Sequence, residues 1–380
     1  MSSFSDSPLH VPLTFPRAGR TMRNRIALAA MTNQQSGDDG LLSDDEYAWL
    51  VRRAEGGFGM VTTCAAHVHR TGRGWPGALG IDSDACLPGL TRLANGIREA
   101  GGLAIVQIFH GGARAPSALS GVQPLSASPG ILPGSGPSAE SARAATTADL
   151  REIIGAFATA AHRAEQAGWD GVELHGAHGY LLAQFLSPLS NQRSDEWGGS
   201  YQNRLRFLRE TLAAVKAAVS PRFIVGVRLS PENFSNQPPE VTLEAFETAR
   251  RLQKDGVDFL HFSLWDCDAC LRSNEGGAPG PTLLSLAREA VAPACPLLVA
   301  GKIHTRADAE RALSQGADAV ALGRVAIAYP EWPRAIREEA FTPAQPPHAE
   351  ESLRAAAVGP KFLAYLRRWP GFVATTRDDA

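Results

Sequence analysis

The chain has few cysteines, no long apolar run and no strong excess of charge of either sign. Its five cysteines among 380 residues are a low and odd number, which disfavours a disulfide framework and fits a reducing compartment. No apolar stretch approaches the roughly 18 residues that span a bilayer. Residues 1–20 are polar and lack the apolar core of a secretory signal. We therefore expect a cytoplasmic protein without a membrane span.

The net charge of the chain limits the classes of partner that it is expected to bind. The formal net charge is −2, and no long run of like charges occurs, which disfavours nucleic acid or an anionic membrane as the main partner. Apolar residues make up 44% and charged residues 20% of the chain, as in an ordinary globular protein. A chain of this length can bury a large hydrophobic core without disulfides or structural metals. We expect a globular protein whose partner is a small molecule.

One theme repeats along the chain, in which a short apolar, β-branched segment precedes a loop and an amphipathic segment. The expected strands cover residues 25–30, 59–63, 104–109, 171–175, 223–228, 259–263, 296–300 and 319–322. Helical patterns cover residues 147–167, 203–219, 242–254, 282–291 and 305–315, the last opened by a capping box of Thr305 and Asp308. This alternation predicts a single α/β domain, a (β/α)8 TIM barrel. A doubly wound open sheet is disfavoured because no G-x-G-x-x-G follows the first strand.

Two stretches interrupt the alternation. Residues 111–146 are rich in Pro, Ser, Gly and Ala and follow the third strand, where a barrel would place them over its active-site face. A functional lid and a disordered segment are equally compatible with that composition. Residues 343–350 are a Pro-rich connection to a tail that contains Arg367 and Arg368. We expect a barrel over residues 1–340 and a connection with a C-terminal tail over residues 341–380.

Glycine follows each of the last two expected strands, at Gly301 and Gly323. In barrels, the loops after strands seven and eight commonly bind phosphate. Glycine lets backbone N–H groups approach a phosphate, and Lys302 and Arg324 can add positive charge. The alternative is that both glycines only end their strands. By itself the pair favours a phosphorylated ligand without identifying it.

Two histidines and a tyrosine follow the fourth expected strand. The segment from Gly171 reads G-V-E-L-H-G-A-H-G-Y-L-L, which places His175, His178 and Tyr180 at the carboxyl end of a strand, where barrel enzymes carry their chemistry. The spacing of the histidines puts both on one side of a turn or helix start. A metal site is one alternative, but it lacks an obvious third ligand. The other is that both histidines only cap the strand.

The continuation of this segment resembles the Old Yellow Enzyme family. Residues 184–200 read Q-F-L-S-P-L-S-N-Q-R-S-D-E-W-G-G-S and lead to Asn203-Arg204. Residues 175–181 read H-G-A-H-G-Y-L. Together with the segment from residue 185 onward, they are similar to the family pattern H-G-A-H-G-Y-L, F-L-S-P-x-x-N-x-R-x-D-x-x-G-G-S and N-R. Further landmarks follow in order, so that the resemblance covers roughly residues 11–335. Relatives with an iron–sulfur cluster carry more cysteines than the single C-x-x-C pair present here, and no metal is expected.

The resemblance implies non-covalent FMN as the cofactor. Gln107 would bond the flavin pyrimidine, because an amide both donates and accepts. Arg228 would stabilise the negative charge near N1 of a reduced flavin, and Thr32 would donate to its O4. The expected cofactor contacts are Ala29, Ala30, Met31, Thr32, Ala65, Gln107, Arg228, Gly301, Lys302, Gly323 and Arg324.

The resemblance also implies an NAD(P)H-dependent ene-reductase that works by a ping-pong mechanism. His175 and His178 would hold the carbonyl oxygen of the substrate, Tyr180 would donate a proton, and Gln34 would line the pocket. Two alternatives stay open: the same barrel acting on nitro compounds or another oxidant, and a flavin-binding barrel without turnover. We expect this chain to form a homo-oligomer, and some relatives insert a tail arginine into the neighbouring site. Arg367 or Arg368 would play that part here, and a solvated basic tail is the alternative.

Overall fold

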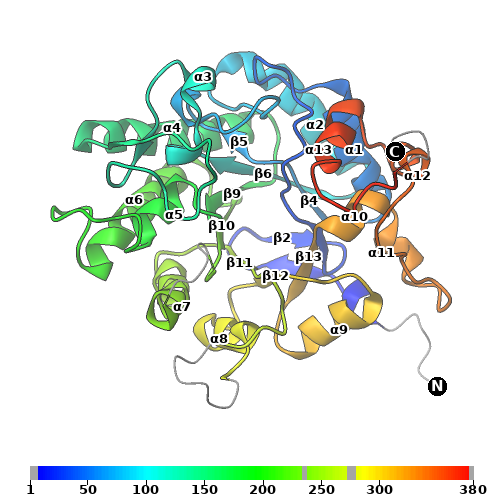
Figure 1. Cartoon of the computed structure of the whole chain (residues 1–380). Coiled ribbons are helices and arrows are strands. Elements are labelled where there is room, and N and C mark those ends of the chain that lie inside the picture. The colour runs from blue at the N-terminus through cyan, green and yellow to red at the C-terminus, as the bar shows by residue number, and fades with distance from the viewer. Residues whose placement is uncertain (1–6, 233–237, 272–279, 376–380) are drawn as a thin grey trace.

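The computed structural model describes residues 7–232, 238–271 and 280–375. A nine-stranded sheet of parallel pairs forms a ring, because β4 pairs with both β3 and β6. Its short strand β5 (Ala66–His67) pairs beside the end of β6. The strands around the ring are β3 (Ile26–Leu28), β4 (Met60–Thr62), β6 (Leu103–Phe109), β9 (Gly171–Gly176), β10 (Ile224–Leu229), β11 (Phe259–Ser263), β12 (Leu297–Ala300) and β13 (Ala319–Leu322). The predicted (β/α)8 barrel is confirmed (Figure 1).

Helices surround this ring (Figure 1). They are α1 (Asp44–Glu55), α2 (Leu87–Glu99), α4 (Thr147–Gln166), α6 (Tyr201–Ala218), α7 (Pro239–Lys254), α8 (Leu283–Ala290) and α9 (Arg306–Ser314), and β13 is followed by the short α10 (Arg324–Ala328). The capping box predicted at Thr305 is present, and Thr146 opens α4 in the same way. Helix α7 begins earlier than predicted, at Pro239, since proline suits the first turn of a helix.

A hairpin that the sequence pattern did not predict lies at the amino end of the barrel. Strands β1 (Leu13–Phe15) and β2 (Arg20–Met22) pair antiparallel, and Phe15 is buried with its ring centroid 5.6 Å from that of Phe259. A Cβ added at Gly226 would lie 2.1 Å from the Phe259 ring. Glycine is therefore required in β10 for Phe259 to fill the barrel interior.

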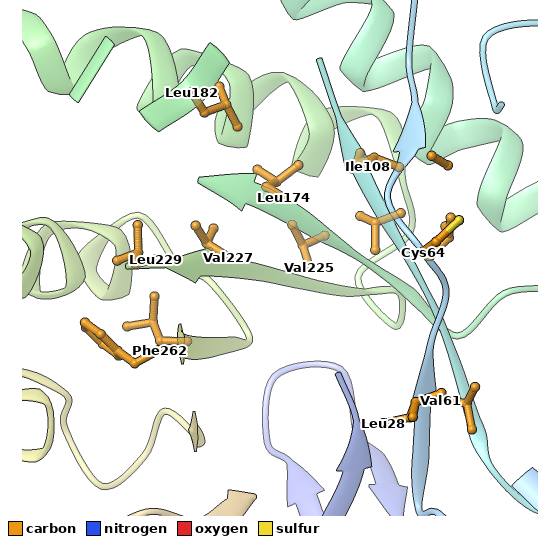
Figure 2. Close-up of a cluster of buried hydrophobic side chains, with 14 of the residues drawn as sticks. Leu28, Val61, Cys64, Ile108, Leu174, Leu182, Val225, Val227, Leu229 and Phe262 are labelled. Carbon is orange, nitrogen blue, oxygen red and sulfur yellow. The ribbon is translucent and has the colours of Figure 1, made fainter. Parts of the chain in front are cut away.

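The ring strands alternate between two faces. Val225, Val227 and Leu229 project from one side of β10 into the buried layer between strands and helices (Figure 2). Because successive side chains of a strand point to opposite faces, the intervening Arg228 points into the barrel. The same alternation turns Gln107 of β6, His175 of β9 and His261 of β11 inward.

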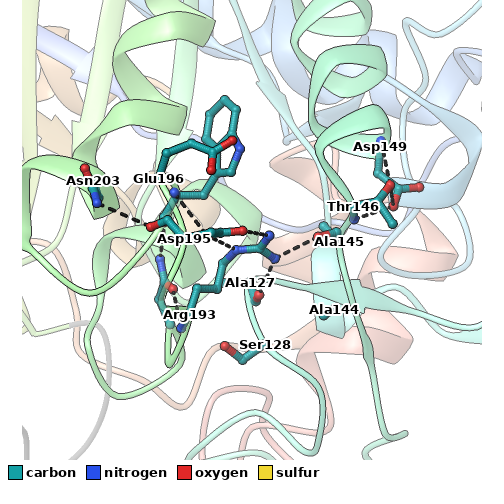
Figure 3. A network of polar contacts seen from close by, with 12 residues as sticks. Ala127, Ser128, Ala144, Ala145, Thr146, Asp149, Arg193, Asp195, Glu196 and Asn203 are labelled. Carbon is teal, nitrogen blue, oxygen red and sulfur yellow. Dashed lines mark hydrogen bonds and ion pairs between the residues drawn. The ribbon is translucent and has the colours of Figure 1, made fainter.

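The long loop after β6 folds against the segment after β9. It contains α3 (Ser117–Ser120) and the paired strands β7 (Leu125–Ser126) and β8 (Arg143–Ala144). Arg193 donates from Nη1 to the carbonyls of Ala127 and Ala145 at 3.0 and 2.7 Å and pairs with Asp195 (Figure 3). A guanidinium held by two carbonyls and a carboxylate fixes the base of this loop. In the structure the segment follows a defined path between β6 and α4.

The segment predicted as a tail packs onto the barrel (Figure 1). It contains α12 (Glu350–Ala355) and α13 (Pro360–Leu366). Phe362 meets Trp49 of α1 edge-on, with ring centroids 5.4 Å apart, and Gly359 donates its N–H to Oε1 of Gln35 at 2.9 Å. Arg367 forms an ion pair with Glu350 of its own chain. The C-terminal helices thus support the loop that follows β3.

Candidate active site

The ring register gathers polar residues inside the barrel, among them the predicted His175, Arg228 and Gln107. His175 of β9 lies opposite Arg228 of β10, and Arg228 lies opposite His261 of β11. On the other side of β9, Glu173 lies opposite Gln107 of β6. Neighbouring inward side chains of parallel strands stand side by side, so these five residues form one continuous polar surface inside the barrel.

His175, His178 and Tyr180 lie together, as predicted. The ring centroids of the two histidines are 5.0 Å apart with planes at 83°, and those of His175 and Tyr180 are 4.8 Å apart at 71°. The ring centroid of Phe109 lies 5.1 Å from that of Tyr180, and Trp75 stacks on Phe109 with ring centroids 5.0 Å apart. The sequence did not identify these two aromatic residues. Together they form an apolar wall beside the three predicted groups.

Both histidines are neutral rings. Desolvation lowers the pKa of His175 and of His178 well below the ordinary value, and the cation of Arg228 adds to the effect. Nδ1 of His175 accepts the N–H of Ala177 at 3.3 Å, so the proton of that neutral ring is on Nε2. Nε2 of His175 and Nδ1 of His178 have no hydrogen-bond partner among the described residues. Each is therefore available to a ligand.

Tyr180 is a protonated phenol at neutral pH. Desolvation raises its pKa to about 12, and the cation of Arg114, 5.9 Å from the ring centroid, acts in the opposite direction. Within the described part of the chain, its hydroxyl has no hydrogen-bond partner. A half-buried phenol of this kind can donate a proton but does not ionise.

A buried carboxylate organises the polar surface. Oε1 of Glu173 accepts from Nε2 of Gln107 at 2.6 Å, and Oε2 accepts from Nδ1 of His261 at 2.8 Å. Burial would raise the pKa of Glu173, but His261 and Arg228 hold it below its ordinary value. Burial lowers the pKa of His261, so its ring is neutral and Nε2 is a free acceptor. Because a carboxylate only accepts, the amide of Gln107 must turn its oxygen away from Glu173.

Arg228 is fixed by two neighbours. Nη1 donates to the carbonyl of Ala30 at 3.0 Å and Nη2 to Oγ of Ser263 at 2.9 Å, while the buried Nε has no protein partner in the described part. Ser263 also lies 2.8 Å from Nε2 of His178. Neither Glu173 nor Ser263 was predicted. The only sequence signal for Glu173 is an acidic residue in a strand whose other residues before His175 are glycine or apolar.

The loop after β3 brings its predicted residues close to this surface. Ala29 and Ala30 are buried, and Met31 and Thr32 are partly buried. Gln34 has φ of 56°, and a Cβ added at Gly77 would lie 2.3 Å from its carbonyl. Its strained backbone therefore depends on the glycine beside it.

Backbone strain is concentrated at the predicted site residues. Non-glycine residues with positive φ in the described chain are Gln34, His178, Lys302 and Ala357. Three of these four were predicted as substrate or cofactor contacts. Left-handed backbone at a non-glycine residue persists only where the surroundings enforce it, and it is common in ligand sites.

The two glycines of the predicted phosphate site lie at the ends of adjacent strands. Gly301 has φ of 154°, and a Cβ there would lie 2.9 Å from the Leu264 carbonyl; a Cβ at Gly323 would meet only Sδ of Met31, at 3.5 Å. Lys302 pairs with Asp266 at 2.7 Å, which neutralises its charge. Arg324 is exposed and has no ion pair within the described ranges. Arg324 is therefore a cation available to a phosphate.

The predicted Ala65 lies away from these glycines, buried in the cluster that contains Trp75 and Phe109.

In the part of the chain that the structure describes, no group of three His, Cys, Asp or Glu side chains is arranged to hold a metal ion. No helix in that part has the length and apolar character to cross a bilayer.

Known proteins match both the sequence and the fold. The model of the NADH:flavin oxidoreductase / NADH oxidase family matches residues 8–342. A probable NADH-dependent flavin oxidoreductase of Bacillus subtilis is 38% identical over 336 residues, which cover 87% of this chain and 88% of that protein. The NADH:acrylate oxidoreductase of Vibrio harveyi is 37% identical over 331 residues, 85% of this chain but 32% of that longer protein.

A solved structure of a similar protein has the same fold. The old yellow enzyme homologue from Zymomonas mobilis superposes with a TM-score of 0.79 and 28% identity, over 92% of this chain and 98% of that one. The sequence match, the shared barrel and the grouping of His175, His178 and Tyr180 lead to one conclusion. The chain belongs to the NADH:flavin oxidoreductase / NADH oxidase family, the family of the Old Yellow Enzymes.

Proposed function

We propose that the chain is an FMN-dependent ene-reductase, which uses NAD(P)H to reduce the activated C=C bond of α,β-unsaturated carbonyl compounds. The observation that carries this proposal is the placing of two neutral imidazole rings 5.0 Å apart beside a protonated tyrosine. The relative named NADH:acrylate oxidoreductase supports it, since acrylate has a C=C bond conjugated with a carboxylate.

The residues present fit FMN. Gln107 turns its amide oxygen away from Glu173, which leaves an acceptor for an N–H of the pyrimidine ring. Arg228 is a fixed, buried cation whose Nε lacks a protein partner in the described part, as an anionic flavin edge requires. Gly301, Gly323 and Arg324 would take the phosphate. FMN, when bound, supplies the hydride for the β carbon of the substrate.

The substrate oxygen is the point that the histidines hold. One N–H from each of His175 and His178 would bind it, and both donors stay neutral because desolvation lowers their pKa. Negative charge grows on this oxygen as the β carbon gains a hydride. Donors aimed at the place where charge develops lower the barrier without reorganising.

Tyr180 completes the reduction. The α carbon needs a proton once the β carbon has gained its hydride, and Tyr180 stays protonated because desolvation raises its pKa to about 12. Its neighbours Phe109 and Trp75 are 0% and 8% exposed, so the phenol donates from an apolar wall. The C=C bond thereby becomes a CH–CH bond, with one hydride and one proton added.

The test is a titration with a phenol, whose oxygen resembles the charged substrate oxygen. Wild-type protein loaded with FMN should bind it and develop a long-wavelength charge-transfer band. The His175→Ala, His178→Ala double variant should lose the band, and a variant at the exposed His162 should keep it. Equal affinity and an equal band in the double variant would show that the histidines do not hold the ligand.

A further inference from the structure

Ser263, at the end of β11, lies between two residues of the site. Its Oγ is 2.9 Å from Nη2 of Arg228 and 2.8 Å from Nε2 of His178. A guanidinium can only donate, so Arg228 occupies one lone pair of Oγ. Among the described residues, Oγ has no other partner. The orientation of the serine O–H is therefore decided by His178 alone.

Two arrangements of this contact are chemically possible. If the serine O–H donates to Nε2, the neutral ring carries its proton on Nδ1. If Nε2–H donates to Oγ instead, two N–H groups converge on one oxygen, the serine hydrogen has no protein acceptor in the described part, and Nδ1 is a bare acceptor. The first arrangement leaves only Nδ1–H of His178 without a protein partner, whereas the second leaves both the serine hydrogen and Nδ1 without one. An unmade hydrogen bond is costly in a desolvated site. The first arrangement is therefore the favoured one.

We propose that Ser263 is a positioning residue that selects the Nδ1–H tautomer of His178 and so makes this ring a donor to the substrate oxygen. The identity of the ligand at Nδ1 rests on the proposed function, whereas the tautomer does not. His175 reaches the same result by a different device, because Ala177 N–H occupies its Nδ1 and leaves Nε2–H free. The two rings thus present N–H groups from opposite nitrogens.

The contact with Arg228 strengthens the donor. Arg228 polarises Oγ, the serine O–H becomes a stronger donor to Nε2, and Nδ1–H of His178 in turn becomes a stronger donor. Such chains of hydrogen bonds reinforce one another where the local dielectric constant is low. His178 has φ of 56°, a left-handed backbone that persists at a non-glycine residue only where the surroundings enforce it. Ligands with a negatively charged or strongly polarised oxygen are the class that this donor would favour.

Nitrogen NMR of protein labelled with 15N-histidine tests the tautomer directly, without substrate or turnover. His178 is assigned by the signal that disappears in His178→Ala. We expect a pyrrole-type shift at Nδ1 and a pyridine-type shift at Nε2 in wild type and in Ser263→Thr, which keeps the hydroxyl. Ser263→Ala should shift His178 toward the Nε2–H form. An Nε2–H tautomer in wild type, or unchanged His178 signals in Ser263→Ala, would overturn the proposal.

Phenol binding provides the second measurement. Ser263→Ala should weaken phenol binding by about 10-fold, as for the loss of one hydrogen bond in a desolvated site, and Ser263→Thr should restore most of the affinity. Equal phenol affinity in wild type and Ser263→Ala would contradict the proposed role. If wild type shows the Nδ1–H tautomer but binds no phenol, the tautomer assignment stands and the proposed function fails.

Discussion

Replacement of Glu173 by glutamine tests how much this carboxylate contributes to the polar surface inside the barrel. Glu173 is fully buried, with 0% exposure, and accepts hydrogen bonds from Gln107 and His261 at 2.6 and 2.8 Å. Glu173→Gln preserves the volume of the side chain but removes its charge. It also converts one acceptor oxygen into an N–H donor that faces another donor.

The expected loss of stability follows from these contacts. Hydrogen bonds to a charged group contribute about 1.5–3 kcal/mol each, and one of the two is replaced by a contact between donors. The remaining bond becomes neutral and weaker, and Arg228 loses a nearby negative charge. We therefore expect the free energy of unfolding to fall by about 2–4 kcal/mol. The midpoint potential of bound FMN should rise, because the less compensated Arg228 favours an anionic reduced flavin.

Urea denaturation and a redox titration measure the two effects. Glu351→Gln is the matched control, since Glu351 is exposed and surface substitutions change stability by about 0.5 kcal/mol or less. If Glu173→Gln unfolded at the same urea concentration as Glu351→Gln and had the wild-type potential, Glu173 would set neither the orientation of Gln107 nor the charge balance of Arg228.

Four further predictions concern other parts of the site. Tyr180→Phe should slow enone reduction by about 10²–10⁴-fold in stopped flow while flavin reduction by NAD(P)H changes little; an unchanged enone rate would assign the proton to another donor. Arg324→Ala should retain FMN less well after desalting, through loss of a charge-assisted contact, and full retention would remove Arg324 from the phosphate site. Burial lowers the pKa of His110 from 6.5 to about 3, so the unfolded chain takes up more protons below pH 6.5. Stability should therefore fall on acidification, by about 2 kcal/mol from this residue at pH 5, and an equal pH slope in His110→Gln would contradict this. If the tail reaches a neighbouring site, replacing Arg367 and Arg368 by alanine should raise the substrate KM of an oligomeric protein, whereas a monomer with unchanged KM would dispose of the idea.

The strand pattern predicted the barrel because the ring strands are apolar, β-branched segments bounded by turns. The N-terminal hairpin was missed, since β1 and β2 are three residues each and derive their stability from closing the barrel. Helices α12 and α13 were described only as a tail. They follow a Pro-rich segment, and their burial depends on partners distant in sequence, such as Trp49.

Some residues of the site could likewise be predicted from the local sequence and others could not. His175, His178 and Tyr180 are close in sequence and end one strand, so their proximity could be predicted. The contacts of Glu173 with Gln107 and of Ser263 with His178 join residues 66 and 85 positions apart in the chain. A serine that ends a strand carries no local signal of such a contact. Only closure of the ring brings it between Arg228 and His178.

Anaerobic stopped flow can show whether the reduced flavin of this protein reduces an enone. Protein loaded with FMN is first reduced with an equimolar amount of NAD(P)H and then mixed with 2-cyclohexenone, with a nitro compound in a parallel experiment. We expect that the absorbance of oxidised flavin returns and that cyclohexanone forms in an equal amount. Flavin that stays reduced with the enone but is reoxidised by the nitro compound would contradict ene reduction as the function of this chain.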